Sequence, residues 1–258
     1  MRPVLFYWFG FPVPAWHVFF LAASLAAFFC FRFLAVRHRA RIRDCDVAFI
    51  FSTTYSTAVL GAIAWASSVE GSMLGWSHPA LSSSGGLIGG ICGGIVVTRW
   101  IGIRPIFIAD LFAVPILVAF AVGRIGCFLN GDDYGIPVGA GTHFLGVVFP
   151  SLADGVSRHP VQIYESVACL VAAITISGIP YLSPLSESTI YRHPGRAAGA
   201  AMVCYGLIRC FIEGIRADWR GPILSLGSHM SVTPPRLVVL LGMIIGIYVL
   251  VGSRRARE

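Results

Sequence analysis

The sequence contains no lysine and few charges of either sign. All 19 of its basic residues are arginines, and only 12% of its 258 residues are charged, whereas soluble domains contain about 25%. The lack of lysine excludes Schiff-base and amine chemistry. With 56% hydrophobic residues and a mean hydropathy of +0.78, the chain is predicted to be a polytopic membrane protein, with one integral-membrane domain over residues 1–258.

Several sequence patterns are also missing. The 7 cysteines show no CxxC or metal-ligand spacing, so we predict no metal, and most of them are expected to be small buried hydrophobes. No internal repeat is evident, which disfavours a transporter. The N-terminal apolar segment is long and precedes a basic cluster, so it is expected to remain as a spanning helix rather than be cleaved as a signal peptide.

Long apolar segments recur along the whole chain. A bilayer core of about 30 Å needs roughly 20 helical residues. The sequence therefore predicts an all-α fold with seven transmembrane helices. They lie at 14–35, 47–68, 85–103, 106–129, 161–182, 197–215 and 235–252.

The arginines between these segments predict an orientation. With seven spans, the basic clusters fall on one side, which is cytoplasmic by the positive-inside rule. The N-terminus is then outside and the C-terminus inside. This distribution favours membrane topology over nucleic-acid binding as the explanation of the +7 charge. The basic clusters are 37–43, Arg99 with Arg104, Arg192 with Arg196, and Arg254 with Arg255 and Arg257. The longer outward loops are 69–84, 130–160 and 216–234.

Glycine crowds the third apolar segment, in GGLIGGICGG (85–94). Small residues at this spacing allow close helix packing, which is the favoured interpretation. The alternative is a backbone that a ligand can approach closely.

Two arginines lie inside apolar segments, Arg124 and Arg209. An arginine at the centre of a membrane helix costs on the order of 3 kcal/mol on translocon scales. The guanidinium stays charged and presents a rigid fork of donors that suits phosphate or carboxylate. The two residues therefore indicate an anionic group bound within the membrane, with a lipid phosphate as the first candidate.

Other polar residues gather near the outward ends of the segments. On a helix, Tyr205, Arg209, Glu213 and Arg216 would form one polar stripe. An ion pair between Arg209 and Glu213 that holds two helices is an alternative explanation of those two residues. It leaves Arg124 unexplained, because the carboxylates near Arg124 come after the predicted helix end.

Three motifs resemble the prolipoprotein diacylglyceryl transferase family. The run GRIGCFLNGDD (123–133) is similar to its signature, and HPVQIYE (159–165) and YGLIRCFIEGIR (205–216) match its two other motifs. The family's Gly-Gly-Leu-Ile-Gly stretch stands at 85–89, and Asp110 stands where the family has Asp. The resemblance implies a bacterial cytoplasmic (inner) membrane enzyme without a cofactor. It would transfer the diacylglyceryl group of phosphatidylglycerol to the lipobox cysteine of a preprolipoprotein signal peptide, releasing glycerol phosphate.

The resemblance also implies a set of site residues. The catalytic candidates are Arg124, Arg209, His159 and Ser84. The substrate-binding candidates are His17, Asp110, Asn130, Gly135, Gln162, Tyr164, Glu165, Tyr205, Glu213 and Arg216.

The chain departs from the family pattern at a few positions. Ser84 replaces a His proposed to activate the thiol, Cys127 replaces Asn, and Asp132 replaces Glu. Three interpretations follow. The first is a true transferase whose base is His159 or His17. The second is a paralogue that binds the same anionic lipid with another acceptor or donor, and the third is a non-catalytic lipid-binding protein. A channel is a remoter alternative, because the polar residues gather in the outer half rather than across the membrane.

Overall fold

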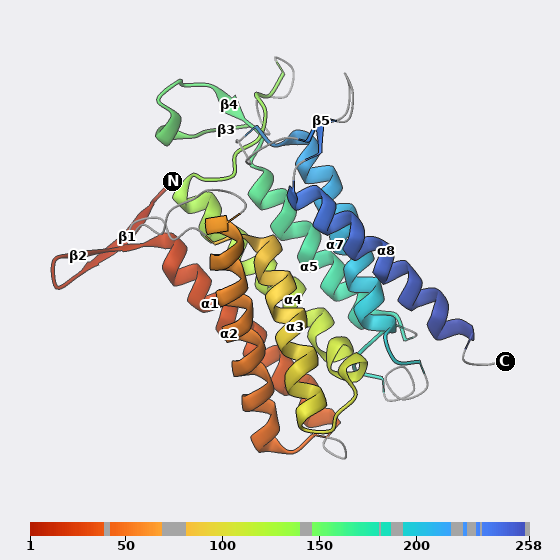
Figure 1. Cartoon of the computed structure of the whole chain (residues 1–258). Helices are drawn as coiled ribbons and strands as arrows, with labels where there is room; N and C mark the ends of the chain where they lie inside the picture. The colour runs from red at the N-terminus through yellow and green to blue at the C-terminus, as the bar shows by residue number, and fades with distance from the viewer. Residues whose placement is uncertain are drawn as a thin grey trace.

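The computed structural model describes residues 1–38, 42–68, 81–139, 146–180, 182–186, 193–217, 224–225, 231–232 and 234–255. Within these ranges the chain forms seven long helices (Figure 1). They are α1 Ala15–Arg37, α2 Asp44–Ser68, α3 Ser83–Trp100, α4 Pro105–Asn130, α5 Val161–Gly178, α7 Arg196–Ile215 and α8 Pro234–Arg255. Each predicted apolar segment is a helix with ends within a few residues of the prediction. Arg192, Arg257, most of loop 69–84 and much of loop 216–234 lie outside the described residues.

Of the helices that the structure describes, five are long and apolar enough to cross a membrane: α1, α2, α4, α5 and α7. Only 22% of the apolar window of α1 and 17% of that of α2 is buried inside the protein, although both are strongly apolar. Such outward faces need lipid around them, so the chain is a multi-pass membrane protein. The other two helices do not qualify as candidate spans. Glycine lowers the hydropathy of α3, and the described apolar part of α8, Arg236–Gly252, is too short. The count of seven spans therefore stays a prediction.

In the described part of the chain, three two-stranded antiparallel sheets accompany the helices, so the all-α prediction holds for the helical body only. β1 (Val4–Trp8) pairs with β2 (Phe11–Pro14), β3 (Val147–Val148) with β4 (Ser157–Arg158), and β5 (Leu224–Ser225) with β6 (Ser231–Val232). A 3-10 turn, η2, covers Pro150–Leu152. These strands are too short to produce an alternating pattern that hydropathy can detect.

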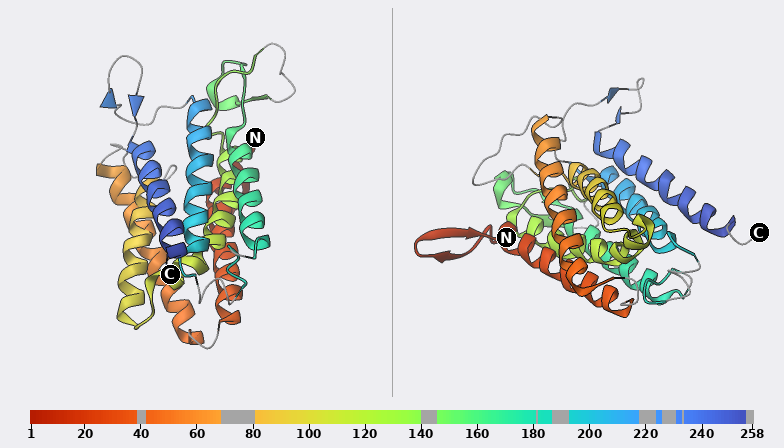
Figure 2. Two further views of the ribbon diagram at one scale, coloured as in Figure 1. Left: turned by 90° about the vertical axis from the view of Figure 1, so that its right-hand side faces the viewer. Right: turned by 60° about the horizontal axis from the view of Figure 1, so that its bottom comes forward.

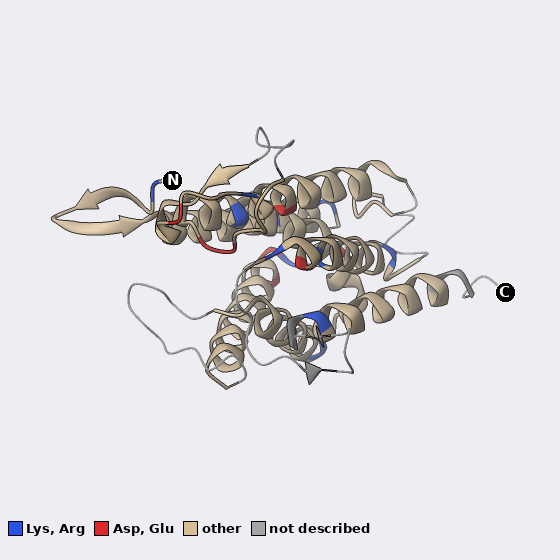
Figure 3. Cartoon of the chain, turned by 90° about the horizontal axis from the view of Figure 1, so that it is seen from above, with Lys and Arg blue, Asp and Glu red and all other residues tan. Residues whose placement is uncertain are grey.

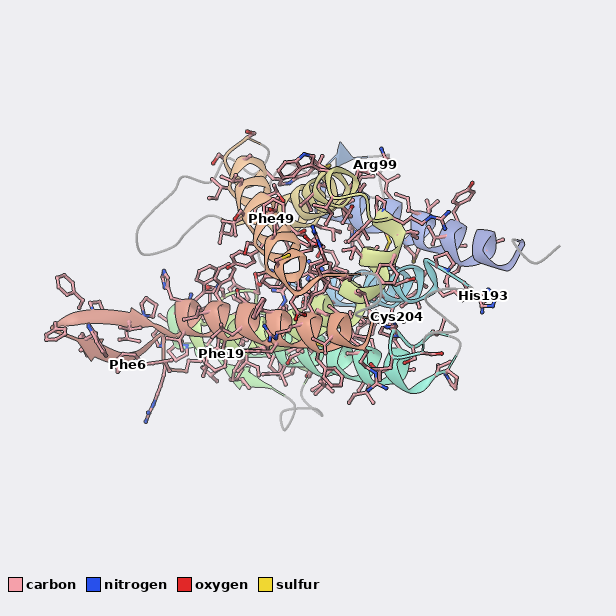
Figure 4. All side chains as sticks on the ribbon, turned by 90° about the horizontal axis from the view of Figure 1, so that it is seen from below. Phe6, Phe19, Phe49, Arg99, His193 and Cys204 are labelled. Atoms are coloured by element: carbon pink, nitrogen blue, oxygen red, sulfur yellow. The ribbon has the colours of Figure 1, made fainter. Side chains whose placement is uncertain are left out.

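The β1–β2 hairpin projects from the bundle beside the start of α1. Its turn has two consecutive residues with positive φ, Phe9 at 48° and Gly10 at 85°, as a two-residue type I′ connection requires. Figure 4 shows Phe6 on this hairpin, away from the helices. Trp8 and Phe9 are 64% and 88% exposed. Exposed aromatic rings where a helix leaves the apolar region are typical of the membrane–water interface.

α4 is the central helix of the bundle. It packs against α1, α5 and α7, while α2 packs mainly on α3 and α7 on α8, an arrangement that the two views of Figure 2 also show. Half of the apolar window of α4 is buried, the largest share among the five candidate spans. Leu111 and Leu117 of α4 are 0% and 1% exposed. A helix surrounded in this way holds its side chains firmly, which matters for the arginine near its end.

The glycines of α3 bring its backbone against α2. A Cβ added at Gly85 would lie 2.2 Å from the carbonyl oxygen of Gly61, and one added at Gly89 would lie 2.3 Å from that of Thr57. Neither position has room for a methyl group. The glycine run therefore serves close helix packing, the first of the two interpretations drawn from the sequence.

Gly89→Ala is expected to destabilise the protein, because overpacking of this kind costs about 1–3 kcal/mol. The melting temperature of the purified protein in detergent should fall by several degrees. Gly94→Ala is the matched control on the same helix, since its Cβ would meet Thr54 at 3.6 Å, an ordinary contact. Equal melting temperatures for the two variants would contradict this account of the α2–α3 interface.

Candidate functional site

Charged side chains meet where the end of α4, the start of α5 and the last turns of α7 come together. Arg124 on α4, Glu165 on α5 and Arg209 on α7 are 8%, 1% and 3% exposed. Viewed from above, acidic and basic positions face one another in the middle of the bundle (Figure 3). Burial at this depth requires each charge to have a partner.

Glu165 is the carboxylate that Arg124 and Arg209 share. The Nε of Arg124 lies 2.9 Å from its Oε2. The Nη1 of Arg209 donates to both of its oxygens, at 3.2 and 3.0 Å. One carboxylate thus ties α4 and α7 to α5.

Asp133 joins Arg124 to Arg216. Its Oδ2 accepts a hydrogen bond from Nη1 of Arg124, and its Oδ1 accepts one from Nη2 of Arg216. The carboxylates near Arg124 do come after the end of α4, but Asp133 still pairs with Arg124, so the expectation that ion pairing leaves Arg124 unexplained is wrong. Gly131 ends α4 in a left-handed conformation, with φ 87°, and its N–H donates to the carbonyl of Cys127. This cap turns the chain back so that Asp133 reaches Arg124.

Glu213 completes the group of six side chains that we call the charged cluster. Its Oε2 accepts from Nη2 of Arg209 at 3.3 Å. The predicted Arg209–Glu213 ion pair is present, but both residues stand on α7. The expectation that this pair holds two helices together is therefore wrong, and Glu165 does so instead. The members are Arg124, Arg209, Arg216, Asp133, Glu165 and Glu213. Guanidinium and carboxylate groups are equal in number, so their formal charges cancel.

The polar stripe predicted on α7 ends before Arg216. The helix stops at Ile215, and Arg216 has extended backbone angles of −80° and 149°. It pairs with Gly135 in an isolated β-bridge instead. That bridge, rather than helical spacing, brings the Arg216 side chain to Asp133. The ring of Tyr205 stacks on Phe120 of α4, with centroids 4.5 Å apart.

Two amide side chains hold the loop after α4. The Nδ2 of Asn130 donates to the Oδ2 of Asp132, and the Nε2 of Gln162 donates to the main-chain oxygen of Asp132. Gln162 is 1% exposed. Its Oε1 is buried and has no hydrogen-bond partner among the residues that the structure describes. A buried acceptor in this condition suits a ligand that brings a donor.

His159 and Gly135 lie next to each other beside this loop. The N–H of Gly135 donates to the carbonyl of His159 at 3.0 Å, and a Cβ at Gly135 would lie 2.7 Å from that oxygen. The Nδ1 of His159 lies 3.2 Å from the hydroxyl of Tyr164. The histidine is half-buried and is positioned by Tyr164 of its own motif and by Gly135 of the loop after α4.

Three predicted site residues lie away from the charged cluster. The carboxylate of Asp110 accepts the N–H groups of Gly195 at 2.6 Å and Ala198 at 2.9 Å, and so caps the start of α7. Its role in substrate binding stays a prediction. Asp110 precedes Arg124 by fourteen residues on α4, or about 21 Å. Ser84 is buried in the first turn of α3, and His17 is exposed, with its ring edge-on to Trp16.

The sequence interpretation missed the roles of Asp133 and Ser166. Asp133 stood in the motif without an assigned contact. The sequence signal for this contact was Gly131, which comes directly before Asp132 and Asp133 and predicts a left-handed helix cap. Ser166, one residue past Glu165, donates its hydroxyl to the carbonyl of Ala121 at 2.6 Å and fixes α5 against α4.

Comparison with known proteins decides the family. The family described as prolipoprotein diacylglyceryl transferase matches residues 3–252 of the chain. The chain belongs to this family. It is similar to proteins named phosphatidylglycerol–prolipoprotein diacylglyceryl transferase from Staphylococcus haemolyticus and from Wolbachia of Brugia malayi. The first is 30% identical over 184 residues, which are 69% of this chain and 59% of that protein. The second is 32% identical over 168 residues, 64% of this chain and 60% of that protein.

A relative of the same name from Staphylococcus aureus is 30% identical over 182 residues, 69% of this chain and 60% of that protein. The matched part of the chain thus spans about three fifths of the relatives' length.

Among the described residues of this prolipoprotein diacylglyceryl transferase family member, no three His, Cys, Asp or Glu side chains are grouped so that they could hold a metal ion.

Proposed function

We propose that this protein transfers the diacylglyceryl group of phosphatidylglycerol to the lipobox cysteine of a preprolipoprotein. The observation that carries the proposal is the charged cluster: three arginines meet at one end of α4, α5 and α7 in a member of this family. Relatives at about 30% identity carry the name of this activity. The same reaction would explain why strongly basic side chains lie among apolar helices.

The reaction requires positive charge near a phosphate. The cysteine sulfur forms a bond to the glyceryl carbon as the bond from that carbon to the phosphate oxygen breaks. The electron pair leaves with glycerol phosphate, so negative charge grows on the departing group. Donors held in place where charge develops stabilise such a transition state. Arg124 and Arg209 would supply them, each fixed by Glu165 in a defined orientation.

The head group needs further contacts and a way in. The unpaired Oε1 of Gln162 would accept a hydroxyl of the head-group glycerol, and Asn130 and Gly135 would shape the same pocket. A cleft between α7 and α8 is lined by Arg209, Cys210, Glu213, Arg236 and Val239. Its volume of about 10 Å³ holds no more than about one water molecule, so a lipid would reach Arg209 from this side only if α7 and α8 moved apart.

The thiol must lose its proton before it attacks, because the thiolate is the nucleophile. His159 is the proposed acceptor, since histidine titrates near neutral pH and this one is held by Tyr164 beside the loop after α4. Ser84 cannot take the proton without a basic partner. A second candidate function, transfer to another acceptor, is favoured by Ser84 and Cys127 at positions where the family has His and Asn.

The proposed orientation places the charged cluster on the outer side of a bacterial cytoplasmic membrane. Arg37, Arg99, Arg104 and Arg196 lie at helix ends on the opposite side of the bundle. By the positive-inside rule that side is cytoplasmic. The N-terminus would then be outside and the C-terminus inside, and the cluster would face the membrane surface where exported preprolipoproteins arrive.

A transfer assay tests the proposed function. Purified protein in detergent would be mixed with phosphatidylglycerol and a lipobox peptide, and both glycerol phosphate and the mass of the peptide would be followed. The proposal requires both products from the native protein and neither from Arg124→Ala. A native protein that binds phosphatidylglycerol but modifies no lipobox peptide would reject the proposed acceptor and favour the second candidate function.

A further inference from the structure

The carboxylate of Asp133 lies between two guanidinium groups in the way that a bound anion would. One oxygen accepts from Arg124 and the other from Arg216. The side chains of Arg124 and Arg216 are 10% and 3% exposed, whereas that of Asp133 is 23% exposed. The cationic side of this contact is therefore buried, and the anionic side faces outward.

Asp133 is also held differently from the other carboxylate that bridges two arginines. Glu165 is 1% exposed and stands on α5, where the helix and the bond from Ser166 to Ala121 fix it. Asp133 lies in the loop after α4 and has a φ of 62°, a conformation that non-glycine residues rarely adopt. Movement of this loop would expose Arg124 and Arg216 while Glu165 keeps its contacts.

The charges of the two anions match. An ionised aspartate carries one negative charge, and so does the phosphodiester of phosphatidylglycerol. Exchange of one for the other leaves the charged cluster neutral. Bidentate acceptors of either kind fit guanidinium donors. If Asp133 must leave before another anion can bind, only molecules in which it has left, here called open, can bind that anion. The apparent affinity for every competing anion is then the intrinsic affinity multiplied by the fraction of open molecules.

We propose that Asp133 is a displaceable internal anion, which occupies the place of the substrate phosphate between Arg124 and Arg216 until phosphatidylglycerol binds. The inference rests on the proposed function and adds a regulatory residue to it. In the empty state the aspartate keeps two buried arginines paired. In the bound state the lipid phosphate takes over both contacts and the loop moves aside.

Two variants remove the carboxylate and tolerate the left-handed backbone, Asp133→Asn and Asp133→Gly. Asp154→Asn is the matched control, because Asp154 is a carboxylate on the neighbouring outer loop that pairs with Arg158 at 2.6 Å. That contact lowers the pKa of Asp154, so it too is an ionised aspartate bonded to an arginine. It lies outside the charged cluster.

The experiment measures the dissociation constants of full-length protein in detergent for three probes: short-chain phosphatidylglycerol, glycerol phosphate and the corresponding diacylglycerol. Both Asp133 variants are expected to bind phosphatidylglycerol about tenfold more tightly than the native protein, if Asp133 lies between the two arginines in about nine tenths of the native molecules. Binding of diacylglycerol, which lacks phosphate, should not change. Asp154→Asn should match the native protein with every probe.

A gain shared by phosphatidylglycerol and glycerol phosphate identifies the phosphate as the competing group, whereas an equal gain for diacylglycerol would overturn the inference. Unchanged or weaker phosphatidylglycerol binding in both Asp133 variants would also overturn it, and would mark Asp133 as a structural partner of the arginines. A native protein that binds phosphatidylglycerol no better than diacylglycerol would instead overturn the proposed function. Melting temperatures of the variants show whether each one is folded.

Discussion

Arg209→Lys is expected to lower the rate of diacylglyceryl transfer about 10²- to 10³-fold, the range found when one oriented donor is removed from an anion-stabilising site. Arg209 uses Nη1 to bond both oxygens of Glu165 and Nη2 to bond Glu213. A lysine keeps the charge but presents one nitrogen in place of a fork. It cannot satisfy two carboxylates and orient a donor toward a phosphate at the same time.

The measurement is the initial rate of glycerol phosphate release at saturating phosphatidylglycerol. Arg158→Lys is the matched control. Arg158 pairs with Asp154 at 2.6 Å, and its guanidinium lies 5.4 Å from the centroid of the Tyr134 ring. It is thus a paired arginine at the same end of the protein but outside the charged cluster, and its replacement should leave the rate near that of the native protein. Full activity in Arg209→Lys would show that charge alone is sufficient.

Glu165→Gln is expected to destabilise the fold by about 3–5 kcal/mol, the cost of removing one partner from a buried ion pair. Glu165 is 1% exposed and accepts from both Arg124 and Arg209. Glutamine has the same shape, but it is neutral and turns an amide NH₂ toward one of the arginines. Arg124 and Arg209 would then both lose a carboxylate partner while remaining buried.

Unfolding in mixed micelles with increasing sodium dodecyl sulfate measures this effect. Glu213→Gln provides the comparison, because Glu213 accepts from Arg209 at 3.3 Å and its side chain is 9% exposed. Its replacement should cost clearly less than that of Glu165. If the two variants unfold at the same detergent fraction, Glu165 is not the centre of the network.

The helices were predictable from sequence because each is an apolar run much longer than a chance cluster. The ends of α2, α4 and α7 fall within three residues of the predicted segments. The short strands could not be predicted, since a pair of residues such as Val147–Val148 carries no periodicity. The β1–β2 hairpin depends on positive φ at Phe9, a residue with no preference for that conformation.

The sequence indicated which residues belong to the candidate site better than it indicated which contacts they make. Family motifs placed Arg124, Arg209 and Glu165 in one site, and the structure brings these three side chains together. Sequence spacing could not show that Asp133 reaches back to Arg124 or that Arg216 meets Asp133, because the first contact depends on a glycine cap and the second on a β-bridge. The capping role of Asp110 could not be predicted for a related reason: its backbone partners lie 85 and 88 residues away along the chain.

The central claim is that the charged cluster binds a lipid phosphate, and a structure of the protein in a nanodisc that contains phosphatidylglycerol tests it most directly. The account predicts phosphate oxygens about 2.8 Å from the guanidinium nitrogens of Arg124, with Asp133 moved away and Glu165 still paired with Arg209. A head group bound elsewhere, with Asp133 still between Arg124 and Arg216, would contradict the account.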